Sequence, residues 1–137
     1  MTKELWINLP VKDVNRSREF FTKIGFTLNP HYGNNEQSAS FFVGSKNFVV
    51  MLFTEPAFKI FTGQPLADTT QGTEVLFSID AESREEVDEL AKKAADAGGT
   101  IFGKPGENQG WMYGCGFADP DGHRWNVLYM DMSKMPK

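Results

Sequence analysis

The stretch TEVLFSIDAESREEVDELAKKAADAGG, residues 73–99, contains the signals of a strand that is followed by a helix. Apolar and polar side chains alternate along residues 73–80, which is typical of a strand with one buried face. Ser83 and Glu86 have the spacing of a capping box, in which both side chains accept hydrogen bonds from free backbone N–H groups at the start of a helix. Apolar residues then recur at every third or fourth position until the glycine pair 98–99, which predicts an amphipathic helix that ends there.

The first part of the chain repeats this order of elements. Residues 4–11 alternate as a strand does, Asp13 is placed to cap a helix, and Gly25 ends that helix. Each helix is followed by three short strand candidates, at 26–31, 38–44 and 47–53 in the first half and at 99–103, 111–118 and 123–130 in the second. The last two are joined by Asp-Pro-Asp-Gly, residues 119–122, with proline and glycine at the turn positions that favour them. The sequence therefore predicts an α+β fold of two βαβββ modules.

We expect a single domain over residues 1–137, with a first module at about 4–54 and a second at about 73–131. The connector between them, about 55–72, contains Pro56 at a position that suits the first turn of a short helix. Such a helix would place Phe58 and Phe61 on one side. Two interpretations are open, a connector that packs on the domain and a lid that closes over a cavity.

The composition excludes several classes of protein. Hydrophobic residues make up 40% of the 137 positions and aromatic residues 13%, which is enough to form a packed core. The net charge of −4, without a basic stripe, disfavours nucleic acid and anionic membranes as partners. No stretch has the length of a membrane span, and the N-terminus lacks the apolar core of a signal peptide. A single cysteine, Cys115, excludes an internal disulfide, so we expect a cytoplasmic protein.

Segments that carry a family resemblance lie in both halves. Residues 8–13 (NLPVKD), 20–21 (FF) and 25–26 (GF) resemble the opening of a module of the vicinal oxygen chelate superfamily, which contains glyoxalases, bleomycin-resistance proteins and extradiol dioxygenases. Residues 78–80 (SID) and 117–123 (FADPDGH) resemble its second module. The chain is most similar to a bacterial subgroup described as predicted lactoylglutathione lyases. The resemblance implies a cupped mixed sheet with the helices on its outer face.

In metal-using members of this superfamily, four strands each supply one ligand to a divalent ion, and the usual ligands are His, Glu or Gln. Carried over to this sequence, the four positions are Trp6, Met51, Glu74 and Asn126. An indole does not coordinate, a thioether is too soft for these metals, and a neutral amide oxygen is a weak donor. Only Glu74 is a good ligand. The resemblance therefore implies a degenerate metal site, with no bound metal and no cofactor.

The candidate ligand-binding residues are those expected to face the cup: Trp6, Asn8, Met51, Glu74, Tyr113 and Asn126. Glu74 is also the candidate catalytic residue, as a general base or as the anionic partner of a cationic ligand. Tyr113 flanks a glycine-rich strand, which permits a ligand to approach closely. Cys115 has no histidine or other base at a telling spacing, so we expect an inert buried thiol.

Two functions from different classes are open. The first is a binding module that holds a small molecule in a metal-free cup, and we favour it because three of the four ligand positions are unsuitable. The second is an enzyme, a lyase or isomerase that uses either an atypical metal site or Glu74 as a base. In both cases we expect a small-molecule partner and a homodimer, because exposed sheet edges invite pairing.

Overall fold

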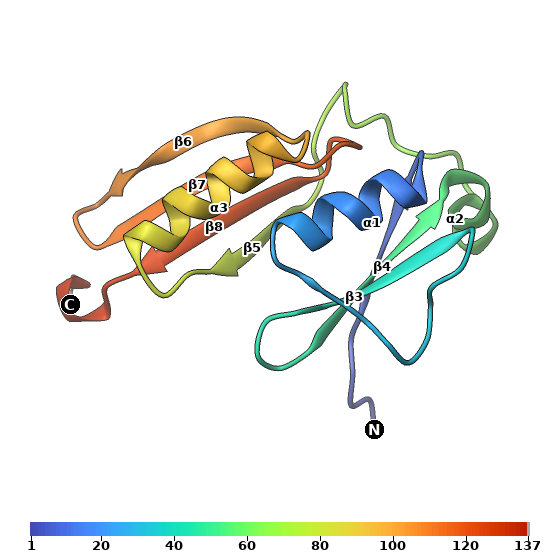
Figure 1. Cartoon of the computed structure of the whole chain (residues 1–137), viewed down its shortest axis with the longest axis horizontal. Helices are drawn as coiled ribbons and strands as arrows, with labels where there is room; N and C mark the ends of the chain where they lie inside the picture. Colours follow the sequence, from blue (N-terminus) through green and yellow to red (C-terminus); the bar gives the residue numbers. More distant parts are fainter. Residues whose placement is uncertain (137) are drawn as a thin grey trace. The chain divides into compact units, whose positions relative to one another are not determined.

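The computed structural model describes residues 1–136 and contains two compact units, Met1–Asp68 and a second that begins at Thr69. Each unit contains a four-stranded mixed sheet with a helix along one face (Figure 1). The fold is therefore α+β, and the prediction of two βαβββ modules is confirmed.

The first unit has its strands in the order β1-β4-β3-β2. Strand β1 is parallel to β4, and the other neighbours are antiparallel. The elements are β1 (Ile7–Val11), α1 (Val14–Lys23), β2 (Thr27–Leu28), β3 (Ser38–Val43), β4 (Phe48–Thr54) and α2 (Glu55–Thr62). Asp13 caps α1 as expected, because its carboxylate accepts a hydrogen bond of 3.1 Å from the backbone N–H of Arg16.

The second unit repeats this topology in the order β5-β8-β7-β6, with β5 parallel to β8. Its elements are β5 (Leu76–Asp80), α3 (Arg84–Asp96), β6 (Thr100–Asn108), β7 (Met112–Ala118), β8 (Arg124–Met130) and a 3₁₀ turn, η1 (Met132–Lys134). The Ser83 hydroxyl accepts from the backbone N–H of Glu86 at 3.1 Å. The Glu86 carboxylate accepts from the N–H of Glu82, one residue before the cap. Both halves of the predicted capping box are therefore used.

Four strands differ from their predicted bounds: β1 begins at Ile7 rather than at residue 4, β2 covers only Thr27–Leu28 of the predicted 26–31, and β5 and β6 differ for identifiable reasons. Strand β5 begins at Leu76 rather than at residue 73, because Leu76 already pairs with Arg124, the first residue of β8. Strand β6 continues to Asn108, through a Gly-Lys-Pro-Gly sequence that favours a turn. It lies at the edge of its sheet, and register shifts on both sides of Gly103 absorb the irregular backbone, which is where proline and glycine are tolerated.

The cores lie between each sheet and its helix. In the first unit, Phe21 of α1 packs on Phe41 of β3, with ring centroids 5.9 Å apart. In the second, the Phe117 ring of β7 stacks on Trp125 of β8 with an interplanar angle of 6°. Because side chains alternate along a strand, the residues next to these core positions face the side of each sheet that α1 or α3 does not cover. Those uncovered faces contain most of the candidate site residues.

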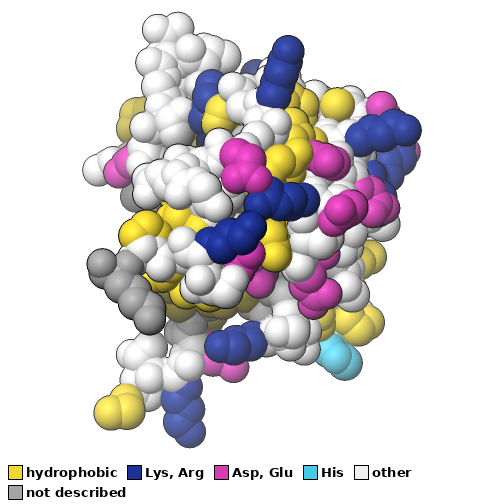
Figure 2. All heavy atoms as spheres, turned by 90° about the vertical axis from the view of Figure 1, so that its left-hand side faces the viewer, with side chains coloured by type: hydrophobic (Ala, Val, Ile, Leu, Met, Phe, Trp, Pro, Cys, Tyr) yellow, Lys and Arg dark blue, Asp and Glu magenta, His cyan; other side chains and the backbone are white. Residues whose placement is uncertain are grey.

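The surface mixes both signs of charge. On the face shown in Figure 2, acidic and basic side chains are interspersed. Within residues 1–136, no helix is long and apolar enough to span a membrane.

Candidate functional site

The parallel strand pairs show which positions correspond in the two modules. Asn8 lies beside Met51 in the first sheet, and Ser78 lies beside Asn126 in the second, where the Asn126 amide donates to the Ser78 hydroxyl at 3.4 Å. Trp6 lies two residues before Asn8 and Glu74 lies four residues before Ser78, so both precede the paired part of their strands.

A divalent metal ion does not fit the side chains at these positions. The uncovered faces present Trp6, Asn8 and Met51 in the first module and Leu76, Ser78 and Asn126 in the second. None of these is a histidine, cysteine or carboxylate, which are the ligands that zinc and its neighbours require. Across residues 1–136, no group of three or more His, Cys, Asp or Glu side chains could hold a metal ion.

The first module contains a hollow of ≈ 620 Å³, a volume typical of small-molecule sites. Its hydrophobic lining consists mainly of Trp6, Tyr32, Phe42, Phe48 and Met51. The segments that meet there are the residues before β1, the loop before β3, the end of β3 and the start of β4. Trp6 is 54% exposed and Tyr32 57% exposed, so both rings are open to an incoming molecule.

The loop that carries Tyr32 is tied to the uncovered face of the sheet by asparagine side chains. The buried Asn29 amide donates to the Ser40 hydroxyl at 3.2 Å. The Asn34 side chain accepts from the Ser40 N–H at 3.0 Å and donates to the Asn29 carbonyl at 2.7 Å. Gly33 has a φ of +86° and lies directly against Ser40 and Met51. These contacts therefore hold the loop that carries Tyr32 against the sheet.

The charged residues of the hollow are Lys3, Glu4 and Lys46. Lys3 and Glu4 come from the segment before β1, and Lys46 comes from the turn between β3 and β4. All three are exposed, so they line the mouth of the hollow rather than its interior.

Trp6 and Met51, which the sequence singles out, line the hollow, and so do Tyr32, Phe42 and Phe48, which it does not single out. The Gly-Asn-Asn stretch at 33–35 indicated a turn, and nothing in the sequence showed that this loop would fold back over the sheet. Phe48 lies outside the alternation of the uncovered face, because it reaches the hollow from the first position of β4. The aromatic richness of the chain was the one available signal.

Glu74 and Tyr113 belong to the second module. Glu74 is exposed and precedes β5. Tyr113 is on the same side of β7 as the buried Cys115 and Phe117, and its hydroxyl donates to Asp88 of α3 at 2.6 Å. Asn126 is on the opposite face of that sheet, so Tyr113 and Asn126 do not line one surface.

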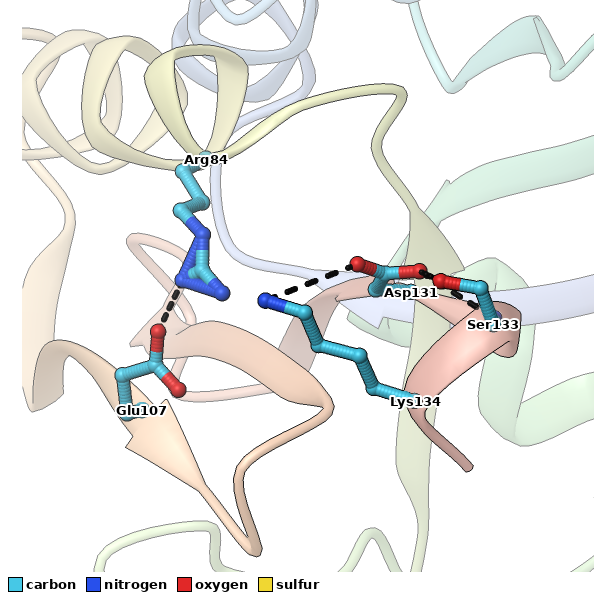
Figure 3. A network of polar contacts seen from close by, with 5 residues as sticks. All are labelled: Arg84, Glu107, Asp131, Ser133 and Lys134. Atoms are coloured by element: carbon cyan, nitrogen blue, oxygen red, sulfur yellow. Dashed lines mark hydrogen bonds and ion pairs between the residues drawn. The ribbon is translucent and has the colours of Figure 1, made fainter. Parts of the chain in front are cut away.

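Arg84 belongs to a network of polar contacts with Glu107, near Asp131, Ser133 and Lys134 (Figure 3). Its guanidinium is ion-paired with Glu107 of β6 and lies over the rings of Tyr113 and Tyr129, 5.4 and 5.9 Å from their centroids. Beyond it, Asp131 accepts from Ser133 and is 3.9 Å from the Lys134 ammonium. The hydrogen bond to Asp88 raises the pKa of Tyr113. These contacts join the start of α3 to β6 and β7 of the second module.

Two further titratable groups are structural. The Asp119 carboxylate is buried and accepts hydrogen bonds from the backbone N–H groups of Asp121 and His123 and from the Trp125 indole. Burial raises its pKa, and the nearby His123 lowers it by a smaller amount. Burial likewise raises the pKa of the Cys115 thiol to about 11, which leaves the thiol protonated and unreactive.

In the connector, α2 begins at Glu55 with Pro56 in its first turn, as predicted. Phe61 is 65% exposed and packs edge-on against Phe53, with ring centroids 5.0 Å apart. Neither Phe58 nor Phe61 lines the hollow. A lid role for this helix stays a prediction.

Comparisons with known proteins agree with this architecture. A family model described as the Glyoxalase/Bleomycin resistance protein/Dioxygenase superfamily matches residues 5–127. The hypothetical protein SA1046 from S. aureus has a similar structure, with a TM-score of 0.81, 34% identity and coverage of 93% of this chain and 94% of that one. A glyoxalase-related enzyme from Fulvimarina pelagi has the same fold, with a TM-score of 0.78, 18% identity and coverage of 93% and 88%. No curated protein matches the chain.

Proposed function

The chain belongs to the Glyoxalase/Bleomycin resistance protein/Dioxygenase superfamily, and on that basis we propose that it binds a small aromatic molecule without using a metal ion. The proposed binding site is the hollow of the first module. The observation that carries the proposal is the lining of this open hollow of ≈ 620 Å³, to which Trp6, Tyr32, Phe42 and Phe48 contribute four aromatic rings.

The chemistry of the lining favours a flat, largely apolar ligand. Aromatic rings bind other rings in offset or edge-on arrangements, and each such contact contributes about 0.5–1.5 kcal/mol beyond the burial of area. Met51 adds a flexible thioether that adapts to the outline of a ring. The loop hydrogen bonds of Asn29 and Asn34 reduce the entropy that would be lost on ordering Tyr32.

The alternative is a lyase or isomerase with an atypical metal site or with Glu74 as a base. It draws on the resemblance to lyase-like proteins. One observation weighs against it: the side chains on the uncovered sheet faces are poor metal ligands. Turnover of the hemithioacetal formed by methylglyoxal and a thiol would favour this alternative.

A titration with N-phenyl-1-naphthylamine, a neutral aromatic dye whose emission rises in apolar surroundings, tests the proposal. We expect saturable binding to the full-length protein. Trp6→Ala and Tyr32→Ala should each weaken binding by about 1–2 kcal/mol, or roughly 5- to 30-fold in Kd, because each removes one ring contact.

Two matched substitutions outside the hollow are the controls. Phe102 is exposed on the second module, so Phe102→Ala removes a comparable ring from a different surface. Tyr113→Phe removes a hydroxyl that is bonded to Asp88. Both should leave the affinity unchanged. Equal losses in the control and test variants, or no loss in the test variants, would show that the dye binds elsewhere.

A further inference from the structure

Two lysines and one glutamate line the mouth of the hollow, although the whole chain has a net charge of −4. Lys3 and Lys46 come from segments far apart in the sequence and meet at the same aromatic hollow. The local balance of +1 is therefore opposite in sign to that of the whole protein. Within residues 1–136, neither lysine is paired with a carboxylate, so both ammonium groups are available to a ligand.

The position of Lys46 is set by a tight turn. The Asn47 N–H donates to the Gly44 carbonyl at 3.1 Å, and both residues have a positive φ, +78° for Gly44 and +55° for Asn47. The strands on either side pair directly, with Val43 opposite Phe48. Lys46 is thus held beside Phe48, one of the rings of the hollow, by backbone geometry rather than by a side-chain contact.

We propose that the hollow selects aromatic molecules that carry an acidic group, such as an aromatic carboxylate or sulfonate, through Lys3 and Lys46. This inference rests on the proposed function, because it concerns the ligand class of the same site. The rings bind the aromatic body of the ligand, and the two ammonium groups attract its anionic group. A small hydrated anion without a ring would not use the aromatic lining.

The charge preference is the reverse of the one that the sequence suggested. Glu74 favoured a cationic ligand, whereas the charged residues that line the hollow are one carboxylate, Glu4, and two lysines. Because all three charged groups are exposed, water and salt weaken each contribution. We therefore expect a selectivity of about tenfold rather than an absolute requirement.

Two dyes with the same anilinonaphthalene ring system distinguish the effect of ligand charge on affinity from the effect of ring contacts. 8-Anilinonaphthalene-1-sulfonate is anionic, and N-phenyl-1-naphthylamine is neutral. The double variant Lys3→Gln/Lys46→Gln should raise the Kd of the anionic dye by about three- to tenfold and leave that of the neutral dye unchanged. Glu4→Gln should lower the Kd of the anionic dye. Added salt should weaken binding of the anionic dye to the native protein and have little effect on the double variant.

The matched control is Lys59→Gln/Lys92→Gln, which makes the same change in net charge at exposed lysines outside the hollow. It should leave both affinities unchanged. If the Kd of the anionic dye changes equally in the two double variants, or in neither, the charge inference is wrong. The proposed function still stands in that case if Trp6→Ala weakens binding of the neutral dye. If Trp6→Ala affects neither dye, or if neither dye binds, the proposed function and the inference fail together.

Discussion

Gly33 lies so close to Met51 that a Cβ atom at position 33 would be 2.8 Å from the methionine Cε carbon. It would also be 2.7 Å from the Cβ of Ser40. Real Cβ atoms do not approach other atoms so closely, so the loop can cover this face of the sheet only with glycine at this position. The contact connects the backbone of the loop to the floor of the hollow.

Gly33→Ala should therefore destabilise the protein and disturb the hollow. Gly44→Ala is the matched control, because Gly44 also has a positive φ, +78°, but a Cβ atom there would meet nothing within 4 Å. We expect the control to cost about 1–2 kcal/mol from backbone strain alone, and Gly33→Ala to cost at least about 1 kcal/mol more. Urea unfolding measures both. Equal losses would contradict the close packing of the loop.

The contribution of Asp119 to the free energy of unfolding should decrease as the pH rises. Burial raises the pKa of its carboxyl above the ordinary value of 3.8, so the folded state binds more protons than the unfolded state between those two pKa values. This contribution to the free energy of unfolding is fully present below the pKa that Asp119 has in the unfolded chain. It is lost as the pH rises through the pKa that Asp119 has in the folded protein. Asp119→Asn removes this dependence, so the difference in unfolding free energy between native protein and variant should shrink as pH rises from about 3.8.

The same variant also has a pH-independent cost. An asparagine amide would turn an N–H donor toward the Trp125 indole N–H, which donates to Asp119 at 3.2 Å. Leaving this buried donor unpaired should destabilise the protein by about 1–3 kcal/mol. Unfolding curves at successive pH values separate the two contributions. A free-energy difference that grows with pH would contradict the raised pKa.

Cys115 should react slowly with iodoacetamide in the folded protein. Burial raises the pKa of the thiol from 9.0 to about 11, which lowers the fraction of thiolate at about pH 8 roughly a hundredfold. The thiol is also inaccessible, with a relative exposure of 4%. Mass spectrometry should therefore show alkylation in denaturant that is at least about a hundredfold faster than in buffer. Similar rates in the two conditions would show that Cys115 is open to solvent.

The proposal that the site works without a metal ion gives a prediction that needs no ligand. After incubation with Zn²⁺, Ni²⁺ or Mn²⁺ and desalting, elemental analysis should find far less than about one ion per chain, because only Glu74 among the four expected ligand positions is a good ligand, and Trp6, Met51 and Asn126 are poor ones. Lactoylglutathione lyase activity should be absent under the same conditions. A stoichiometric ion, or turnover restored by metal, would contradict the degenerate site.

The fold could be predicted from the sequence because its signals are local. The Asp13 and Ser83 caps, the Asp-Pro-Asp-Gly turn and the repeated order of strand and helix depend only on neighbouring residues. The hollow could not be predicted in this way. It depends on the loop around Gly33 folding over the sheet, where the Asn29 side chain donates to the Ser40 hydroxyl and the Asn34 side chain accepts from the Ser40 N–H. These bonds join positions that no periodicity connects.

The bounds of the first strands were the second limit. The sequence predicted that Trp6 and Glu74 lie on the first strand of their modules, whereas β1 begins at Ile7 and β5 at Leu76, so both residues precede those strands. The sequence could not show that β5 begins only where β8 offers it a partner. Homodimerisation and a role for Glu74 stay predictions.

The most direct test of the account is to locate an aromatic molecule on the protein by NMR. The chain has three tryptophans, so a ¹⁵N-labelled sample gives one indole N–H signal for each, and Trp6→Phe assigns that of Trp6. As N-phenyl-1-naphthylamine is added, the Trp6 signal should shift progressively, because its ring lines the hollow. The Trp125 signal should stay in place, because that indole is buried and bonded to Asp119. A Trp6 signal that does not move while those of Trp111 or Trp125 shift would contradict the binding site.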